Sequence, residues 1–222
     1  TVEVIDEIAK TSMVKGENWF NHLLTFSEAE VDILAIRHPE NLLPQRLALL
    51  CLKHHFREKI INLGDGNYFH PTQGLGDLFT TEEHHREKFG KEPLKIAIGA
   101  DMKARVIHSL VMALGKYPVA LTLVSWQEPE YLIRQEFIQE FLSNGGKITP
   151  IGKLAPGEKF DVIYWVRYQI EHGPEGEKEK LQAKYNEDFQ VTPKFLNTHL
   201  KDDGIFLAPG PMTEEIDIRI NS

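Results

Sequence analysis

Residues 94–124 read LKIAIGADMKARVIHSLVMALGKYPVALTLV, and this stretch decides the fold. The apolar run 94–98 has the length of a buried strand and is followed by Gly99. A helix is predicted over about 103–116, and 119–124 is a second apolar run of strand length. A strand, a helix and another strand in this order predict two parallel strands joined by a crossover helix, which is the repeating unit of α/β folds.

The same alternation continues toward the C-terminus. A helix is predicted over 128–143, where Ile133, Phe137 and Phe141 recur at a spacing of four residues and form one apolar face. Further strands are predicted over 148–151, 161–166 and 205–207, and the charged segment 171–184 is expected to be a solvated loop and helix. The pattern therefore predicts a parallel, doubly wound sheet with helices on both faces.

A second, shorter α/β pattern precedes this one. Strands are predicted over 31–36 and 60–63, and helices over 45–56 and 71–88. The second strand runs into the turn Gly64-Asp65-Gly66-Asn67, and Gly90 ends the second helix. We therefore expect an α/β protein of two domains with parallel, doubly wound sheets flanked by helices, divided into residues 1–88 and 89–222.

Composition and charge limit the classes of function. The chain has 222 residues, and its 33 acidic against 25 basic side chains give a formal net charge of −8. Such a surface repels phosphate backbones and anionic lipid, so nucleic-acid and membrane partners are not expected. Cys51 is the single cysteine, which excludes an internal disulfide. No apolar stretch of membrane length and no leader-like start is present, so a cytoplasmic location is expected.

Polar and basic side chains follow several predicted strands. They are Arg37 and His38 after 31–36, His70 and Gln73 after 60–63, Arg105 after 94–98, and Arg167 and Gln169 after 161–166. In open parallel sheets, ligands bind beyond the carboxyl ends of the strands. Each of these residues, taken alone, could equally have an ordinary structural role, such as forming a surface ion pair or capping a helix. Their common placement indicates a site for a small, oxygen-rich anion, because guanidinium groups bind carboxylate and phosphate bidentately.

Other chemistries find less support in the residues. The pairs His54-His55 and His84-His85 are adjacent in sequence, and adjacent helical residues point in different directions, so neither pair suits a metal ion. The glycine-rich phosphate-binding signatures are missing. Ser109 follows His108 within a predicted helix and lacks the glycine pattern of a nucleophile elbow. Metal, nucleotide and serine hydrolase chemistry are therefore not expected.

Ordered motifs that span most of the chain resemble the aspartate carbamoyltransferase family. They are Lys15-Gly16-Glu17, Arg37-His38-Pro39, Gly64-Asp65-Gly66 with His70-Pro71-Thr72-Gln73, Arg105 with His108-Ser109-Leu110, Arg167 with Gln169 and Glu171, and Ala208-Pro209-Gly210-Pro211 with Glu214-Glu215-Ile216. The Gly64-Asp65-Gly66 motif and the Arg167-x-Gln169 spacing favour the aspartate branch over the ornithine branch.

The resemblance implies transfer of a carbamoyl group from carbamoyl phosphate to L-aspartate, a step of pyrimidine biosynthesis. It implies that Arg37, His70 and Gln73 contact carbamoyl phosphate, with Arg37 and His70 polarising its carbonyl oxygen. Similarity to the family implies three further residues, Arg105, Arg167 and Gln169, as ligands of the aspartate carboxylates. Both substrates are small anions.

Further implications concern assembly and the remaining site residues. The resemblance places Lys15, with Thr11 where the family has a serine, in the site of a neighbouring subunit, and so implies a homo-oligomer, a trimer. It adds the late loop of Pro209, Gly210 and Pro211 to the substrate-binding residues. It implies no metal and no organic cofactor.

The chain also departs from the family pattern. The phosphate-binding Ser-Thr-Arg-Thr loop is absent from these residues and is expected N-terminal to Thr1, and the family's terminal helix is expected after the last residue. In the late loop, Ala208, Gly210 and Met212 replace a histidine, a leucine and an arginine. The 222 residues alone are therefore expected to be inactive. Two other readings stay open: a catalytically inactive subunit with a structural or regulatory role, and a transferase for another amine.

Overall fold

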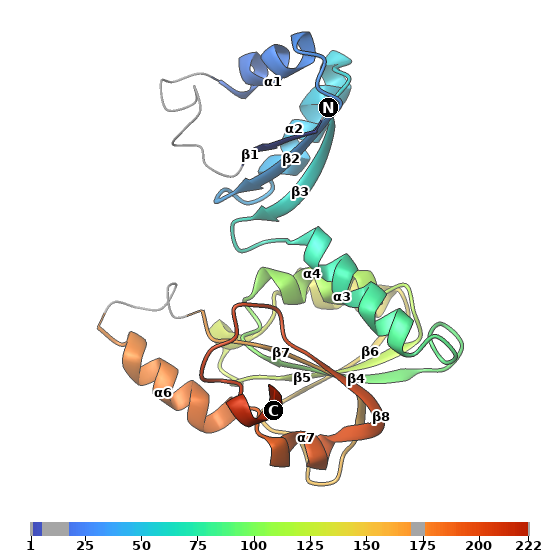
Figure 1. Ribbon diagram of the computed structural model, residues 1–222, viewed down its shortest axis with the longest axis vertical. Coiled ribbons are helices and arrows are strands. Elements are labelled where there is room, and N and C mark those ends of the chain that lie inside the picture. Colours follow the sequence, from blue (N-terminus) through green and yellow to red (C-terminus); the bar gives the residue numbers. More distant parts are fainter. Residues whose placement is uncertain (1, 6–17, 170–175, 222) are drawn as a thin grey trace. The chain divides into compact units, whose positions relative to one another are not determined.

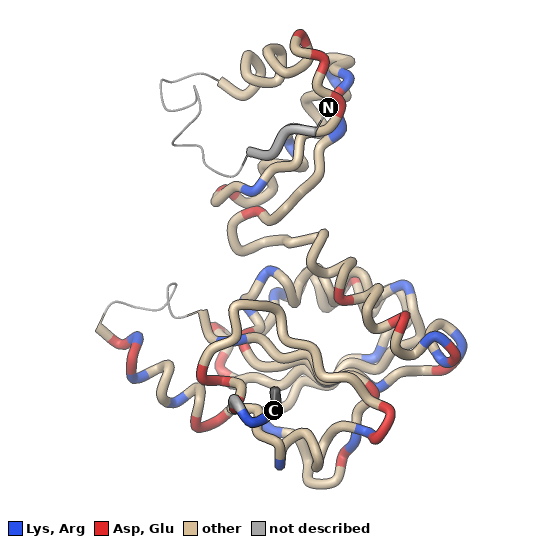
Figure 2. Tube along the Cα trace, in the orientation of Figure 1, with Lys and Arg blue, Asp and Glu red and all other residues tan. Residues whose placement is uncertain are grey.

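The computed structural model describes residues 2–5, 18–169 and 176–221 (Figure 1). The chain divides into two compact units, Thr1–Gln73 and Gly74–Ser222, which are described separately. No described helix is both long enough and apolar enough to cross a membrane. Figure 2 shows acidic and basic residues interspersed along the described chain, most clearly on the charged helix α6 (Lys178–Phe189).

The first unit contains three parallel strands in the order β1-β2-β3. Its elements are β1 (Val2–Ile5), α1 (Trp19–Glu28), β2 (Ile33–His38), α2 (Leu43–His54) and β3 (Lys59–Asp65). Leu34 and Ile36 alternate along β2 and are completely buried in one cluster with Leu23 of α1 and Leu47 of α2. Both helices therefore contribute to the core on the Leu34 and Ile36 side of the strand.

Local sequence sets where these helices begin. Asn18 caps α1, because its side-chain oxygen accepts a hydrogen bond from the backbone N–H of Asn21 at 2.9 Å. In α2, Pro44 occupies the first turn, where its missing N–H has no partner to lose. Leu42 precedes that helix with a left-handed backbone angle, φ 62°.

The second unit contains a five-stranded parallel sheet in the order β6-β5-β4-β7-β8. Its elements are α3 (Pro71–His84, which begins in the first unit), β4 (Leu94–Ala100), α4 (Arg105–Leu114), β5 (Val119–Val124), the short 3-10 helix η3 (Pro129–Tyr131), α5 (Gln135–Ser143), β6 (Lys147–Ile151), β7 (Phe160–Val166), α6, α7 (Pro193–His199), β8 (Leu200–Leu207) and η5 (Ile218–Asn221). The strand order reverses direction between β4 and β7, so this sheet is doubly wound.

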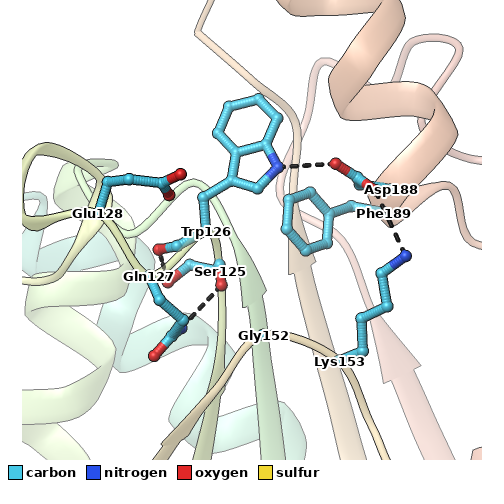
Figure 3. Close-up of a pocket in the computed structure, with 8 residues that line it drawn as sticks. All are labelled: Ser125, Trp126, Gln127, Glu128, Gly152, Lys153, Asp188 and Phe189. Atoms are coloured by element: carbon cyan, nitrogen blue, oxygen red, sulfur yellow. Dashed lines mark hydrogen bonds and ion pairs between the residues drawn. The ribbon is translucent and has the colours of Figure 1, made fainter.

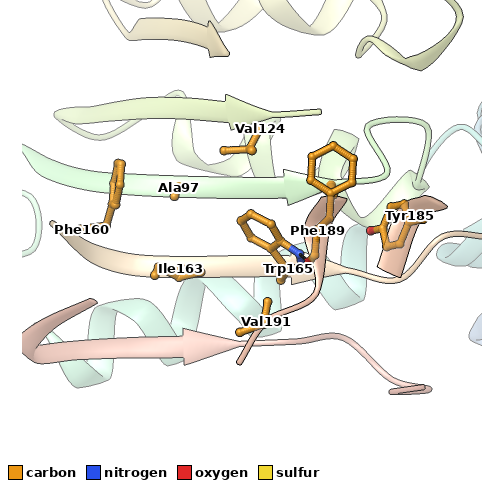
Figure 4. Close-up of a cluster of buried hydrophobic side chains, with 9 residues drawn as sticks. Ala97, Val124, Phe160, Ile163, Trp165, Tyr185, Phe189 and Val191 are labelled. Atoms are coloured by element: carbon orange, nitrogen blue, oxygen red, sulfur yellow. Dashed lines mark hydrogen bonds between the residues drawn. The ribbon is translucent and has the colours of Figure 1, made fainter. Parts of the chain in front are cut away.

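Helices cover both faces of this sheet (Figure 1). Every residue of β7 is buried, as expected for a central strand of a parallel sheet. On one face Trp165 packs with Tyr185 and Phe189 of α6 (Figure 4), and its indole N–H donates to the Phe189 carbonyl at 2.8 Å. In α3, Asp77 accepts a hydrogen bond of 2.7 Å from the hydroxyl of Tyr164. The core of this unit is therefore built around β7.

The α/β class and the parallel sheets are confirmed, with differences at several elements. The strand β1 and the helices α1 and α7 are additional to the predicted elements. The predicted helix 128–143 is wrong in its first turns, because Leu132 and Arg134 have extended backbones and α5 begins only at Gln135. Ile133 of this extended segment is buried, and Tyr131 of the preceding η3 packs against Trp126, with ring centroids 4.7 Å apart. Burial of these side chains thus overrides the helical periodicity.

Candidate functional site

The candidate site in the second unit lies at the carboxyl ends of β4 and β7, where the strand order reverses. Asp101 directly follows β4, and Arg105 is the first residue of α4. Arg167 and Gln169 follow β7. The two strands pair in register from Ile96–Val162 to Ala100–Val166. The sheet therefore brings together the loops that carry three of the predicted substrate ligands, at the point where doubly wound folds bind ligands.

The Asp101 carboxylate joins these two loops. One oxygen accepts a hydrogen bond from the backbone N–H of Lys103 at 3.0 Å, and the other accepts from the backbone N–H of Gln169 at 3.1 Å. The sequence motifs assign no role to Asp101. Its position directly after a buried strand could have identified it as a candidate site residue. Asp101 sets the loop of Arg105 against the segment of Arg167 and Gln169.

Arg105 is the first residue of α4 and follows the buried residue Ala104. Ala104 is completely buried and has no side chain that caps α4, so the first helical N–H groups are not satisfied by a side chain of that residue. His108, one turn further on, is also completely buried; its Nε2–H donates to the Met102 carbonyl at 3.2 Å, and its ring stacks on Phe137. His108 therefore holds the 101–104 loop in place.

The segment after β7 is bonded to its own backbone. The Arg167 guanidinium donates to the carbonyl of Tyr168 at 3.1 Å, and all three residues from Arg167 to Gln169 are half-buried. A half-buried guanidinium and amide facing a sheet edge provide hydrogen-bond donors for a carboxylate.

The late loop follows β8. Pro209 is half-buried, whereas Gly210 and Pro211 are exposed. Beyond them the chain is fixed by Glu215, which is 2% exposed and accepts hydrogen bonds from the Thr213 N–H at 3.0 and 3.1 Å. Met212 is 52% exposed.

In the first unit, Arg37 lies inside the end of β2 rather than after it. The strand continues to His38, and the prediction that it ends at residue 36 is wrong; Pro39 is the residue that stops it. The β2–β3 register shifts by one residue between Ile36 and His38. Arg37 sits at this irregularity and is exposed, and such shifts re-aim a side chain at the end of a strand.

Asp65 organises the turn that leads from β3 to His70. It is completely buried and accepts hydrogen bonds from the Asn62 side chain at 2.8 Å, the Phe69 N–H at 3.1 Å and the Leu42 N–H. The Gly66 N–H, in turn, donates to the His38 carbonyl at 2.8 Å. The loop after Arg37 and the loop before His70 are thus bonded to each other.

His70 precedes α3 and is half-buried. Its Nδ1 accepts a hydrogen bond of 3.3 Å from the backbone N–H of Gln73. An accepting Nδ1 carries no proton, so a neutral His70 holds its proton on Nε2. The half-buried Gln73 lies in the first turn of the same helix. Thr11 and Lys15 lie outside the residues that the structure describes.

The adjacent histidine pairs have structural partners. His84 and His85 donate from Nε2 to the carbonyls of Asp203 and Asp161, both at 3.1 Å, and His54 packs against Phe20. Among the described residues, no group of three histidine, cysteine or acidic side chains gathers as a metal site would require.

A cavity of about 530 Å³ opens beyond the ends of β5 and β6 (Figure 3). The Asp188 carboxylate accepts a hydrogen bond of 2.8 Å from the Trp126 indole and lies 3.4 Å from the Lys153 ammonium. The indole hydrogen bond and then the lysine hold the pKa of Asp188 below its usual value. The motifs assign no role to these residues, because they come from three separate elements and share no short pattern.

Models of two domains match the sequence. Residues 1–83 match the carbamoyl-P binding domain of aspartate/ornithine carbamoyltransferase, and residues 92–221 match the Asp/Orn binding domain of the same family.

Curated relatives and solved structures agree with these models. The aspartate carbamoyltransferase catalytic subunit of Ligilactobacillus salivarius is 32% identical over 93% of this chain and 62% of its own length. That of Ignicoccus hospitalis is 32% identical over the whole chain and 68% of its own length. A Trypanosoma cruzi aspartate transcarbamoylase in complex with N-(phosphonacetyl)-L-aspartic acid has the same fold, with a TM-score of 0.78 at 22% identity, over 98% of this chain and 66% of that one. The chain spans 62% and 65% of two of the bacterial relatives it matches.

Proposed function

Because this chain belongs to the aspartate/ornithine carbamoyltransferase family, we propose that it serves the transfer of a carbamoyl group from carbamoyl phosphate to L-aspartate in pyrimidine biosynthesis. The observation that carries the proposal is the link made by Asp101, which bonds the loop of Arg105 to the segment of Arg167 and Gln169. Two guanidinium groups on neighbouring strand ends suit an acceptor that carries two carboxylates.

The acceptor is held by the second unit. Arg105 and Arg167 bind the carboxylates of aspartate, and Gln169 adds an amide donor. The half-buried state of these side chains supports this role, because partial burial strengthens a charge-assisted hydrogen bond.

The donor is held by the first unit, through Arg37, His70 and Gln73. A neutral His70 with its proton on Nε2 donates a hydrogen bond to the carbonyl oxygen of carbamoyl phosphate, and Arg37 adds positive charge. Both stabilise the negative charge that develops on this oxygen when the amine attacks. The hydrogen bond from Gln73 to Nδ1 supports this assignment, because it selects that tautomer.

The reaction needs no redox step. The amino nitrogen of aspartate bonds to the carbamoyl carbon, the carbon–oxygen bond to phosphate breaks, and phosphate leaves with that electron pair. The proton lost by the nitrogen passes to the departing phosphate. Orientation and electrostatic stabilisation supply the catalysis.

The proposal includes assembly, location and domain limits. The active form is a cytoplasmic homotrimer in which Lys15 and Thr11 act in the site of a neighbouring subunit. The late loop of Pro209, Gly210 and Pro211 contacts the substrate, and the functional domains are residues 1–88 and 89–222. The two matched family models, 1–83 and 92–221, support this division.

Calorimetric titration with N-(phosphonacetyl)-L-aspartate tests the proposal without requiring turnover. We expect the wild-type chain to bind, and Arg167→Ala to weaken binding by at least about 30-fold, since truncating one partner of a desolvated, hydrogen-bonded charge pair costs roughly 2–5 kcal/mol. The control is Arg86→Ala, which removes a solvent-exposed arginine of the same unit and should leave affinity unchanged. Absence of binding, or equal affinity of Arg167→Ala and wild type, would overturn the proposal.

A further inference from the structure

Tyr168 lies between the two proposed aspartate ligands that follow β7. Its half-buried ring contacts Tyr185 of α6, with centroids 5.5 Å apart, and Trp126 of the loop after β5, with centroids 6.2 Å apart. The side chain between Arg167 and Gln169 is therefore held by two elements distant in sequence.

Trp126 is itself fixed. Its indole N–H donates to Asp188 at 2.8 Å, as Figure 3 shows, and its ring packs edge-on against Tyr131 at 4.7 Å. The ammonium of Lys184 lies 4.7 Å from its ring centroid, within cation–π range. A tryptophan with a bonded N–H and contacts on several sides has little rotational freedom, so it is a rigid support for Tyr168.

Tyr185 supports the same segment from α6. It is 1% exposed, and its hydroxyl donates to the carbonyl of Val166, the last residue of β7. Burial raises the pKa of this hydroxyl well above its usual value, so it stays a donor. The backbone is thus bonded at Val166 before Tyr168, and at Gln169, through Asp101, after it.

We propose that Tyr168 is a positioning residue, whose ring, packed against both Trp126 and Tyr185, which also contact each other with centroids 6.0 Å apart, clamps the backbone of residues 167–169 and thereby fixes the direction of Arg167 and Gln169. The ligand part of this inference rests on the proposed function. Small displacements matter at such a site, because a shift of about 1 Å in a positioning group can cost about 100-fold in rate.

Hydrogen exchange of two amides that share the Asp101 carboxylate tests the clamp without a ligand. In Tyr168→Ala we expect the Gln169 amide to exchange about tenfold faster than in wild type, and the Lys103 amide to change less than about threefold, because only the first lies on the clamped segment. Tyr168→Phe keeps the ring and should restore the wild-type rate. Tyr117→Ala is the matched control. It removes another half-buried tyrosine, which lies just before β5 and packs on Phe89.

An unchanged Gln169 rate in Tyr168→Ala overturns the proposal, as does acceleration of both amides together. If Tyr168→Ala does not fold, Tyr168→Leu, which keeps apolar volume without the ring, is measured in the same way and with the same criteria.

Titration with L-aspartate separates this inference from the proposed function. We expect the dissociation constant to rise about tenfold in Tyr168→Ala and to stay within about twofold of wild type in Tyr168→Phe and Tyr117→Ala. If the wild-type chain binds no aspartate, the proposed function fails, and the exchange rates still decide whether Tyr168 positions the segment. If aspartate binds equally to wild type and Tyr168→Ala, the positioning role fails while the proposed function stands.

Discussion

Glu58 in the first unit and Asp161 in the second are both nearly completely buried, 3% and 2% exposed, but their surroundings differ. Asp161 accepts hydrogen bonds from the backbone N–H of Lys95 at 2.9 Å and the ammonium of Lys201 at 2.8 Å. Neither carboxylate oxygen of Glu58 has a hydrogen-bond partner among the residues that the structure describes. A buried carboxylate without a partner costs free energy, so Asp161 is satisfied in the second unit whereas Glu58 is not satisfied in the first.

Central and edge strands of the two sheets differ in exposure. In the second unit both faces of β7 are covered, and all its residues are buried. In the first unit β3 alternates, and Ile61 remains 40% exposed. On α2, Leu49 and Leu52 are 58% and 69% exposed. In the second unit, Leu75 and Phe79 of α3 are 59% and 61% exposed, so exposed apolar side chains on helices occur in both units.

The largest effect is expected at Asp161. Asp161→Ala should lower the free energy of unfolding of the second unit by about 3 kcal/mol, because it leaves the Lys95 N–H and the Lys201 ammonium without their acceptor. Hydrogen exchange of the β7 amides measures this change. Asp203→Ala, which breaks an exposed pair with Lys88, is the control and should change stability by less than about 1 kcal/mol. If both variants lower the free energy of unfolding by the same amount, the hydrogen bonds of the buried Asp161 contribute no more to stability than an exposed ion pair.

A smaller effect of opposite sign is expected at Glu58. Glu58→Leu should raise the stability of the first unit by about 2 kcal/mol, because it removes an unpaired buried carboxylate and keeps apolar volume. Hydrogen exchange of the β2 and β3 amides reports it, with the exposed Glu28→Leu as control. Destabilisation by Glu58→Leu would mean that the carboxylate is satisfied, and the two units would then be equivalent in this respect.

Most of the second unit could be predicted from its sequence. Strands such as β4 and β7 are mostly apolar runs, and their carboxyl ends mark where Arg105 and Arg167 must lie. The break before α5 could not be predicted, since burial of Ile133 decides it. The contact of Trp126 with Asp188 likewise joins residues 62 positions apart and leaves no local pattern. Individual site residues can therefore be predicted from the positions of the strand ends. The side chains that support them cannot, because they depend on packing between residues distant in sequence.

The proposed function places the recognition of aspartate by the second unit at the ends of β4 and β7. Titration of the isotope-labelled chain with L-aspartate, followed by backbone amide NMR, tests this claim residue by residue. We expect the largest shift changes at the amides of Arg105, Arg167 and Gln169, and none at β3 in the first unit. Shift changes confined to the cavity lined by Trp126 and Lys153, or no change at any of these amides, would mean that aspartate does not bind at the ends of β4 and β7.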